Sequence, residues 1–270
     1  MKIIEDHDWD KLGKKYKDAK PFPSICIDDF LDIKFANSLV KSYPKYSEAR
    51  TIGREFSSLN ENLKIQITDL NDFPDPVKLL SQALSEPEFI DNISTLTGIK
   101  DLIWDPDFSG GGIHLTNTSG LLDVHVDFNF ETKLNLYRRL NILIYLNPTW
   151  EKKWGGQVEL WDKDVQDCIQ SFEPVFNRCV LFTTSDFSFH GVNAVNSPEN
   201  ISRNSFAAYY YTKEAGDNSG EVYGGHHTTI FKARPSEKIK KYWLMPKNKV
   251  ETTLAKSKKE LKSRVKRLIN

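Results

Sequence analysis

A histidine and an aspartate lie two residues apart in an apolar, strand-like run, LLDVHVDFNF at residues 121–130. Residues i and i+2 of a β-strand project from the same face, so His125 and Asp127 are expected to point into one space. An imidazole nitrogen and a carboxylate oxygen at this separation can hold one metal ion if the fold brings in a third ligand. His190 is the best candidate, because it follows the strand-like run CVLFTTSDFSF and precedes Gly191, where a sheet can turn.

Two histidines and one carboxylate form the facial triad of non-haem Fe(II) oxygenases, which leaves three coordination positions open. A structural zinc site would instead be closed by four ligands, usually including cysteine. The His-x-Asp pair alone is weak evidence, since such pairs recur by chance. The alternative is a hydrogen-bonded histidine beside an exposed aspartate.

A later strand-like run, SRNSFAAYYYT, strengthens the case for chemistry. Arg203 and Ser205 are again two residues apart, and a guanidinium fork beside a hydroxyl suits the far carboxylate of a dicarboxylate ligand. Tyr145, in LNILIYLN, can add a phenol hydrogen bond from a neighbouring strand. Taken singly, Arg203 also suits a surface salt bridge and Tyr145 a core aromatic. Taken together and in this order, they favour a co-substrate site.

The elements that must position these residues fall into two parts. In the first hundred residues, PSICIDDFL reads as a strand, and Asp32 is expected to cap a helix that stops before Pro44. Apolar residues at helical spacing fill 75–97, with Gly98 as the C-cap. Short β-rich runs separated by turn residues follow from residue 101. We therefore expect a mainly β, α+β fold: a helical support layer at 1–100 in the same domain as an all-β core at 101–215, and an extension at 216–270.

The motif set resembles the 2-oxoglutarate- and Fe(II)-dependent oxygenases, specifically their prolyl 4-hydroxylase-like branch. The segments that carry the resemblance, in the family's order, are VHVDFN, RRLNILIYLNPTW, WGGQVELWD, FEPVFNRCVLFTTSDFSFHGV and SRNSFAAYYYT. The resemblance implies a double-stranded β-helix (jelly roll). It also implies that His125, Asp127 and His190 are the catalytic iron ligands. It places Arg203 and Tyr145 on the distal carboxylate of 2-oxoglutarate, with Ser205 and Asn141 as further co-substrate contacts.

The implied cofactor is Fe(II), with 2-oxoglutarate and O₂ as co-substrates and ascorbate as an additional candidate. The implied reaction hydroxylates an unactivated C–H bond of a prolyl residue, a free amino acid or another small metabolite. The intact Asp127 argues against halogenation. Three alternatives remain: a non-catalytic jelly-roll binding module, a nucleic-acid demethylase of the same superfamily, and a cupin-type metal enzyme that does not use 2-oxoglutarate.

The substrate itself is not predicted beyond a small molecule, peptide or protein, because substrate choice depends on loops outside the iron shell. Asn129 and His114 are the candidate substrate contacts. His226 and His227 are adjacent, so on a strand they would face opposite ways and could not both bind one ion. We expect them on a loop that contacts substrate.

Composition restricts partner and location. Lysine plus arginine equals aspartate plus glutamate, 37 each, but residues 247–270 hold nine basic and two acidic residues. The rest of the chain is therefore acidic, which argues against a nucleic-acid partner. The stretch 250–270 is expected to form a basic amphipathic helix that docks, contacts an acidic partner or self-associates. Three scattered cysteines and no long apolar stretch predict a cytoplasmic protein without a transmembrane segment.

Overall fold

The structure is a computed structural model that describes residues 2–217 and 219–246. The chain divides into two compact units, Met1–Phe231 and Lys232–Asn270. The description below concerns the first unit, which contains all the candidate site residues. The amphipathic helix expected at 250–270 lies outside the described residues. No helix in 2–217 or 219–246 has the length and apolar character needed to cross a bilayer.

The N-terminal part supplies most of the helices, as the periodicity predicts. The Asp32 side chain accepts a hydrogen bond from the Phe35 amide and so caps α2, and Gly98 ends α5 in the left-handed region at φ 75°. Both sequence predictions of helix ends are therefore confirmed. The helices are α1 (Trp9–Asp18), α2 (Ile33–Ser42), α3 (Tyr46–Ile52), α4 (Asp75–Ser85) and α5 (Pro87–Thr97), with short 3₁₀ turns η1 (Leu70–Asp72) and η2 (Lys152–Trp154).

The strands form one antiparallel, strongly curved sheet whose central order is β1-β10-β7-β12-β5-β11-β8-β9, with β3 and β2 added beside β5. Their bounds are β1 (Ser24–Ile27), β2 (Arg54–Ser57), β3 (Glu61–Ile67), β4 (Ile103–Trp104), β5 (Gly112–Val126), β6 (Phe130–Glu131), β7 (Leu136–Tyr145), β8 (Val158–Trp161), β9 (Cys168–Phe172), β10 (Arg178–Thr183), β11 (His190–Val192), β12 (Arg203–Thr212) and β13 (Ile230–Lys232).

Strand β5 joins the two halves of the sheet. Its first part pairs with β12, with Arg203 opposite Thr116, and its last part pairs with β11, with His190 opposite His125. A bulge between these parts lets one strand serve both layers. The result is the double-stranded β-helix that the resemblance implied, and the predicted fold class is confirmed.

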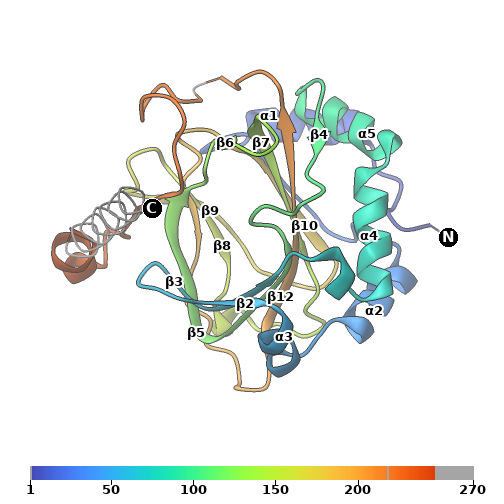
Figure 1. Ribbon diagram of the computed structural model, residues 1–270, viewed down its shortest axis with the longest axis horizontal. Coiled ribbons are helices and arrows are strands. Elements are labelled where there is room, and N and C mark those ends of the chain that lie inside the picture. The colour runs from blue at the N-terminus through green and yellow to red at the C-terminus, as the bar shows by residue number, and fades with distance from the viewer. Residues whose placement is uncertain (1, 218, 247–270) are drawn as a thin grey trace, which may run out of the picture. The chain divides into compact units, whose positions relative to one another are not determined.

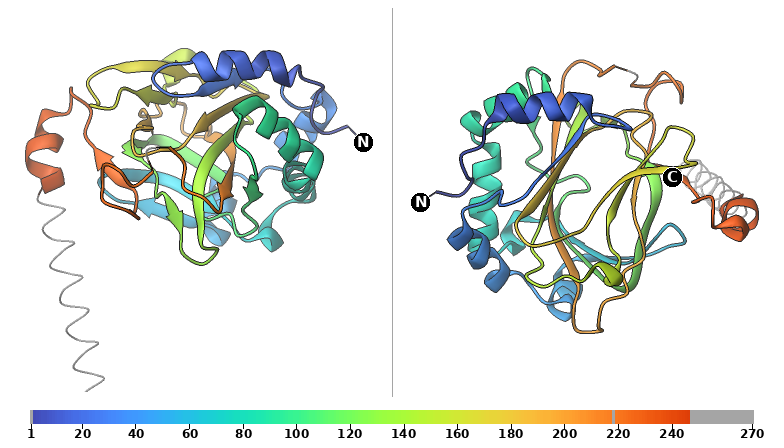
Figure 2. Two further views of the ribbon diagram at one scale, coloured as in Figure 1. Left: turned by 90° about the horizontal axis from the view of Figure 1, so that it is seen from above. Right: turned by 180° about the vertical axis from the view of Figure 1, so that it is seen from behind.

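The helices cover one face of the β1-β10-β7-β12 layer (Figure 1), and they stay on that side in both further views (Figure 2). The opposite face of the layer is left for the pocket described below. The interface between helices and sheet is the main apolar core, in which buried side chains of α2, α4 and α5 meet outward-facing residues of β7, β10 and β12. Examples are Leu39, Leu80, Ile93, Ile142, Leu181 and Phe206.

Two adjacent leucines of α4 test this core. Leu80 is completely buried and Leu79 is 40% exposed. Leu80→Ala is expected to lower the free energy of unfolding by about 2–5 kcal/mol, because it removes transfer energy and leaves a cavity. Leu79→Ala is expected to change it by less than about 1 kcal/mol. Urea unfolding of the two variants measures the difference, and equal losses would contradict the assigned helix face.

Candidate metal and co-substrate site

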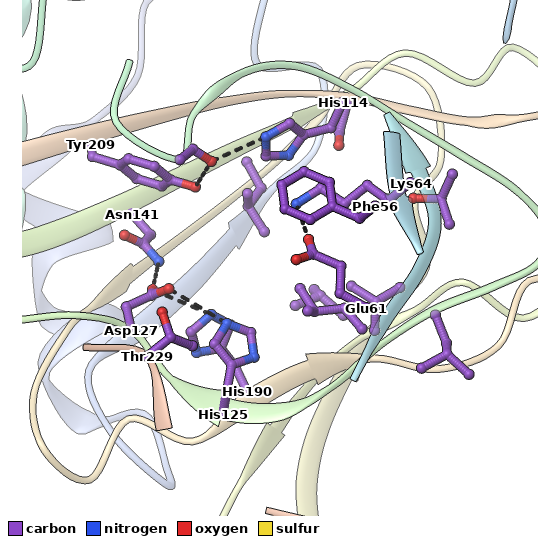
Figure 3. A pocket seen from close by; sticks show the side chains of 18 of the residues that line it. Phe56, Glu61, Lys64, His114, His125, Asp127, Asn141, His190, Tyr209 and Thr229 are labelled. Carbon is purple, nitrogen blue, oxygen red and sulfur yellow. Dashed lines mark hydrogen bonds and ion pairs between the residues drawn. The ribbon is translucent and has the colours of Figure 1, made fainter. Parts of the chain in front are cut away.

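The three expected ligands lie together. His125 is the second-last residue of β5, and Asp127 directly follows that strand. His190 is the first residue of β11 and lies opposite His125. The Nε2 atoms of His125 and His190 lie 3.4 and 3.5 Å from the two Asp127 carboxylate oxygens. Among the described residues, they form the one group of three such side chains whose ligand atoms all lie within 4.8 Å of one another. Figure 3 shows them converging on one side of the pocket.

The element that delivers His190 differs from the prediction. Strand β10 ends at Thr183 instead of running on to Phe189. Residues Ser185 and Ser188 hydrogen-bond to each other through side chain and backbone, which closes a local turn. Such serine contacts compete with strand pairing. His190 therefore begins a new strand, and this strand places it across from His125.

Hydrogen bonds orient both imidazoles. The Nδ1 of His125 lies 2.8 Å from the Asp123 carbonyl oxygen, and the Nδ1 of His190 lies 2.9 Å from the Ser188 carbonyl oxygen. A carbonyl only accepts, so each Nδ1 donates and each Nε2 points toward the shared centre. Burial, with the neighbouring His125, lowers the pKa of His190 to about 4. The ring is therefore neutral near pH 7, as a metal ligand must be.

A second group of residues holds the Asp127 carboxylate. The Asn141 amide donates to Asp127 Oδ2 at 2.8 Å, and Arg138 lies 3.3 Å from the same oxygen. Arg138 also donates to Asn141 Oδ1 at 3.1 Å, and its guanidinium lies 3.5 Å from the centre of the Tyr209 ring. Burial alone would raise the pKa of Asp127, but the Arg138 guanidinium beside it, foremost among its neighbours, holds it well below its ordinary value. The carboxylate is thus ionised.

Asn141 and Arg138 both line the pocket beside Asp127. The Asn141 amide and carbonyl bond to Asp127 and Arg138, and its contact with the co-substrate stays a prediction. Arg138 was not singled out from the sequence. A charged residue within the apolar strand LYRRLNILIY is the signal that could have found it, because arginine is rarely fully buried without a partner.

Arg203 lines the same pocket on β12. Its Nε donates to the Gly156 carbonyl at 2.7 Å, and its terminal nitrogens lie 3.3 Å from the Tyr145 hydroxyl and 3.4 Å from the Ser205 hydroxyl. The side chain is buried, and no acidic side chain in residues 2–217 or 219–246 forms an ion pair with it. Burial lowers the pKa of this guanidinium, yet arginine remains charged at neutral pH.

Tyr145 and Gly156 both contact the Arg203 guanidinium. Burial raises the pKa of Tyr145 to about 12, so its phenol stays protonated and able to donate. Gly156 has a φ of 72°, and a Cβ there would lie 3.1 Å from the Arg203 side chain. The paired glycine before β8 therefore forms a tight turn against Arg203. A buried cation without a counter-ion is costly unless a ligand supplies the negative charge.

The pocket that joins these groups has a volume of about 300 Å³. Apolar side chains such as Leu143, Val158 and Phe182 line it together with the ligands and Arg203. His114 also lines it, with Nε2 3.1 Å from the Gly110 carbonyl, and burial lowers its pKa well below the ordinary value. It is thus placed as a pocket histidine, and contact with substrate stays a prediction.

The β2–β3 hairpin contributes a wall that sequence reasoning missed. Phe56, Glu61 and Lys64 come from this hairpin and line the pocket (Figure 3). Lys64 pairs with Glu61 at 2.9 Å and lies 5.4 Å from the centre of the Phe56 ring. The hairpin is largely polar and has no clean alternation, so its strand character depends on pairing with β5.

Asn129 does not lie where the strand pattern placed it. Strand β5 ends at Val126, so the alternation that would carry Asn129 to the ligand face stops first. Asn129 is buried outside the pocket lining, and its amide binds Gly225 and His227. His226 and His227 are on a loop, as expected, but neither lines the pocket. His226 stacks on Phe130 with ring centres 3.7 Å apart.

The metal-free protein should lose stability on acidification. The unfolded chain protonates His190 near its ordinary pKa of 6.5, whereas the folded chain does so only near pH 4. Between these values only the unfolded state holds the proton, so the free energy of unfolding rises with pH by up to about 1.4 kcal/mol per unit. The pKa of buried His114 is also lowered, so His114 too makes the free energy of unfolding fall on acidification. The lowered pKa of Asp127 affects the free energy of unfolding only below about pH 4.

We therefore expect His190 alone to lower the free energy of unfolding by on the order of 2 kcal/mol between pH 6.5 and pH 5. Urea unfolding at several pH values, in the presence of a chelator, measures this slope. His114→Gln should make it shallower. A free energy of unfolding that stays constant from pH 5 to 6.5 would contradict the neutral, buried state of both rings.

Comparison with known proteins agrees with this metal and co-substrate site. Residues 100–211, which include every candidate ligand and Arg203, match the profile of the 2OG-Fe(II) oxygenase superfamily. Residues 100–211 therefore carry the domain of this superfamily. Fe(II) and 2-oxoglutarate are the cofactor and co-substrate of the 2OG-Fe(II) oxygenases. The donor set fits them: two imidazoles whose Nδ1 atoms bond to backbone carbonyls and an ionised carboxylate for the metal. For a carboxylate of the co-substrate there is a buried guanidinium with which no acidic side chain of the described residues forms an ion pair.

The proteins that this chain resembles include prolyl hydroxylases. Over 78 residues the chain is 36% identical to mouse prolyl 3-hydroxylase OGFOD1, a match that spans 27% of this chain and 14% of the mouse protein. A Trichoplax adhaerens prolyl hydroxylase, solved with a hypoxia inducible factor peptide, has a TM-score of 0.54 at 16% identity, over 77% of this chain and 94% of that one. A Pseudomonas putida prolyl-4-hydroxylase has a TM-score of 0.53 at 16% identity, over 75% and 100%. The two structures support the fold.

Proposed function

We propose that this chain is an Fe(II)- and 2-oxoglutarate-dependent dioxygenase that hydroxylates an unactivated C–H bond. The observation that carries the proposal is the unpaired, buried Arg203 in the same pocket as His125, Asp127 and His190. A metal site alone would suit many proteins. Here the metal site lies in one pocket of about 300 Å³ with the Arg203 guanidinium, which can bind a carboxylate. This arrangement suits a dicarboxylate that is bound to the metal.

His125, Asp127 and His190 would hold the iron, and Arg203, Tyr145 and Ser205 would bind the distal carboxylate of 2-oxoglutarate. When bound, the iron supplies oxidation by O₂, in which 2-oxoglutarate becomes succinate and CO₂ and one oxygen atom enters the substrate C–H bond. The neutral Tyr145 phenol and the guanidinium donate to the carboxylate and fix its orientation. Leu143, Val158 and Phe182 exclude water from the space between.

Asn141 and Arg138 would act through Asp127. They engage its Oδ2 atom, which keeps the carboxylate ionised and limits its rotation. The rings of Phe128 and Tyr209 lie against the Arg138 guanidinium and help to hold this cation in place. The buried groups Arg138 and Asn141, and not solvent, thereby stabilise the negative charge of Asp127.

For the substrate we propose a prolyl residue in a peptide or protein, on the basis of the named relatives; a free amino acid or another small metabolite is the second candidate. The acidic balance of the chain before the tail gives no support for nucleic acid. We also propose a cytoplasmic location, which the free thiols of Cys26, Cys168 and Cys179 favour. Fluorescent tagging of the full chain in cells tests the location.

A succinate-release assay tests the activity. Anaerobic protein is first mixed with Fe(II) and 2-oxoglutarate, and a weak visible charge-transfer band is expected. Oxygen is then added with a panel of proline, prolyl peptides and cell extract, and succinate is measured with mass spectrometry of the products. Succinate release with a mass gain of one oxygen atom supports the proposal and identifies the substrate class. Absence of both band and succinate would refute it.

A further inference from the structure

A segment after β12 returns to the metal site and forms part of its wall. We call residues 219–231 the strap; it ends within β13. Thr229 and Phe231 of the strap line the pocket, and the Phe231 ring centre lies 5.4 Å from that of His125. Figure 3 shows Thr229 next to Asp127. The strap therefore faces the space in which a substrate must meet the metal.

A buried carboxylate outside the pocket holds the first part of the strap. Asp186 has no exposed surface, and it accepts hydrogen bonds from the backbone amides of Gly220 at 2.9 Å and Val222 at 3.0 Å. Its Oδ1 atom also lies 3.1 Å from His227 Nε2. All three contacts come from the strap. Since a buried carboxylate is costly without such partners, Asp186 and the strap stabilise each other.

Asn129 holds the second part of the strap. Its amide donates to the Gly225 carbonyl at 3.0 Å, and its carbonyl accepts from the His227 amide at 2.9 Å. The Gly225 amide in turn donates to the Gly220 carbonyl at 2.9 Å and closes the loop. Gly220 has a φ of 81°, and a Cβ there would lie 2.9 Å from the Gly225 carbonyl oxygen. The loop thus requires glycine at this position.

Both anchors belong to chain segments that carry metal ligands. Asn129 lies two residues after Asp127, and Asp186 lies four residues before His190. The strap therefore bridges the segment after β5 and the turn before β11. Its docking fixes the pocket wall relative to two of the three ligands, although neither anchor enters the pocket.

We propose that the strap is the specificity-determining wall of the site, with Asp186 and Asn129 as positioning residues and the Thr229 hydroxyl as a substrate contact. The inference rests on the proposed dioxygenase function. The Thr229 hydroxyl has no hydrogen-bond partner in the described part of the chain, and it lies beside the ligands. It is available to a polar group, such as a peptide amide, next to the carbon that is oxidised. Phe231 supplies the apolar surface beside it.

The anchors are tested without turnover. In Asp186→Asn, hydrogen exchange of the peptide that contains Gly220 and Val222 should become at least about tenfold faster, because bonds from these two amides to a charged acceptor are lost. Glu221→Gln is the matched control, since it makes the same change on an exposed carboxylate of the strap. In the Co(II)-loaded protein, paramagnetic shifts of the Thr229 and Phe231 protons should decrease in Asp186→Asn only. Unchanged exchange and unchanged shifts would overturn the anchor.

Thr229→Val tests the contact, because it removes the hydroxyl and keeps the volume. Strap exchange and 2-oxoglutarate affinity should stay at wild-type values. The KM for the substrate found by the panel should rise about three- to tenfold, as for one lost neutral hydrogen bond, with kcat within about twofold. An unchanged KM would overturn the role of Thr229. Wild-type protein without any succinate release would refute the proposed function instead, and the exchange and Co(II) data would still decide whether the strap docks through Asp186.

Discussion

Replacing Arg203 with methionine is expected to raise the dissociation constant for 2-oxoglutarate by roughly 30- to 4,000-fold, since losing a buried charge partner costs about 2–5 kcal/mol. Methionine keeps much of the apolar stem but loses the Nε hydrogen bond to the Gly156 carbonyl. The affinity for the metal should change little, because Arg203 contacts none of the three ligands. Calorimetric titration of 2-oxoglutarate into anaerobic, Mn(II)-loaded protein measures the effect.

Two variants sharpen this experiment. Arg203→Lys keeps the charge but loses the fork, so an intermediate affinity is expected. Arg50→Met removes an arginine that is mostly exposed and pairs with Glu55 on the surface, and it should leave the titration unchanged. If Arg203→Met bound 2-oxoglutarate as tightly as the wild type, the carboxylate would bind elsewhere in the pocket and the proposed role of Arg203 would be wrong.

The positions that the sequence predicted well are those fixed by local rules. Asp32 and Gly98 mark helix ends because capping depends on a few neighbouring residues. Arg203 and Ser205 share a face because β12 is a regular strand of ten residues. Each prediction needed only the period of one element. The arrangement of His125 opposite His190 agrees with the resemblance, which carries the pairing that periodicity cannot supply.

The positions that the sequence did not predict depend on contacts between distant segments. Arg138 holds Asp127 because the register between β7 and β12 shifts at Tyr210, and no local pattern reveals such a bulge. Asn129 turns to the strap because β5 ends three residues earlier, at Val126. Asp186 finds its donors more than thirty residues later in the chain. In each case a buried polar group is satisfied by a partner that only the tertiary fold brings near.

Metal affinity should fall in a graded series that separates ligands from supporting residues. His125→Ala removes one of three donors, and it is expected to abolish the charge-transfer band of the Fe(II)–2-oxoglutarate complex. Asn141→Ala keeps all three donors but frees Asp127 Oδ2, so a loss of about 10–100-fold in metal affinity is expected. His226→Ala removes an exposed histidine that stacks on Phe130 outside the pocket, and it should change nothing.

Titration of Mn(II), followed by electron paramagnetic resonance under anaerobic conditions, gives the three affinities without any turnover. The order is informative because the two alanine changes at the site differ in distance from the metal but remove groups of similar polarity. A band that persists in His125→Ala would contradict the ligand assignment. An effect of Asn141→Ala equal to that of His125→Ala would mean that Asn141 is itself a ligand. The hydrogen bonds of Asn141 argue against that, since its carbonyl oxygen is already bound to Arg138 and its nitrogen donates to Asp127.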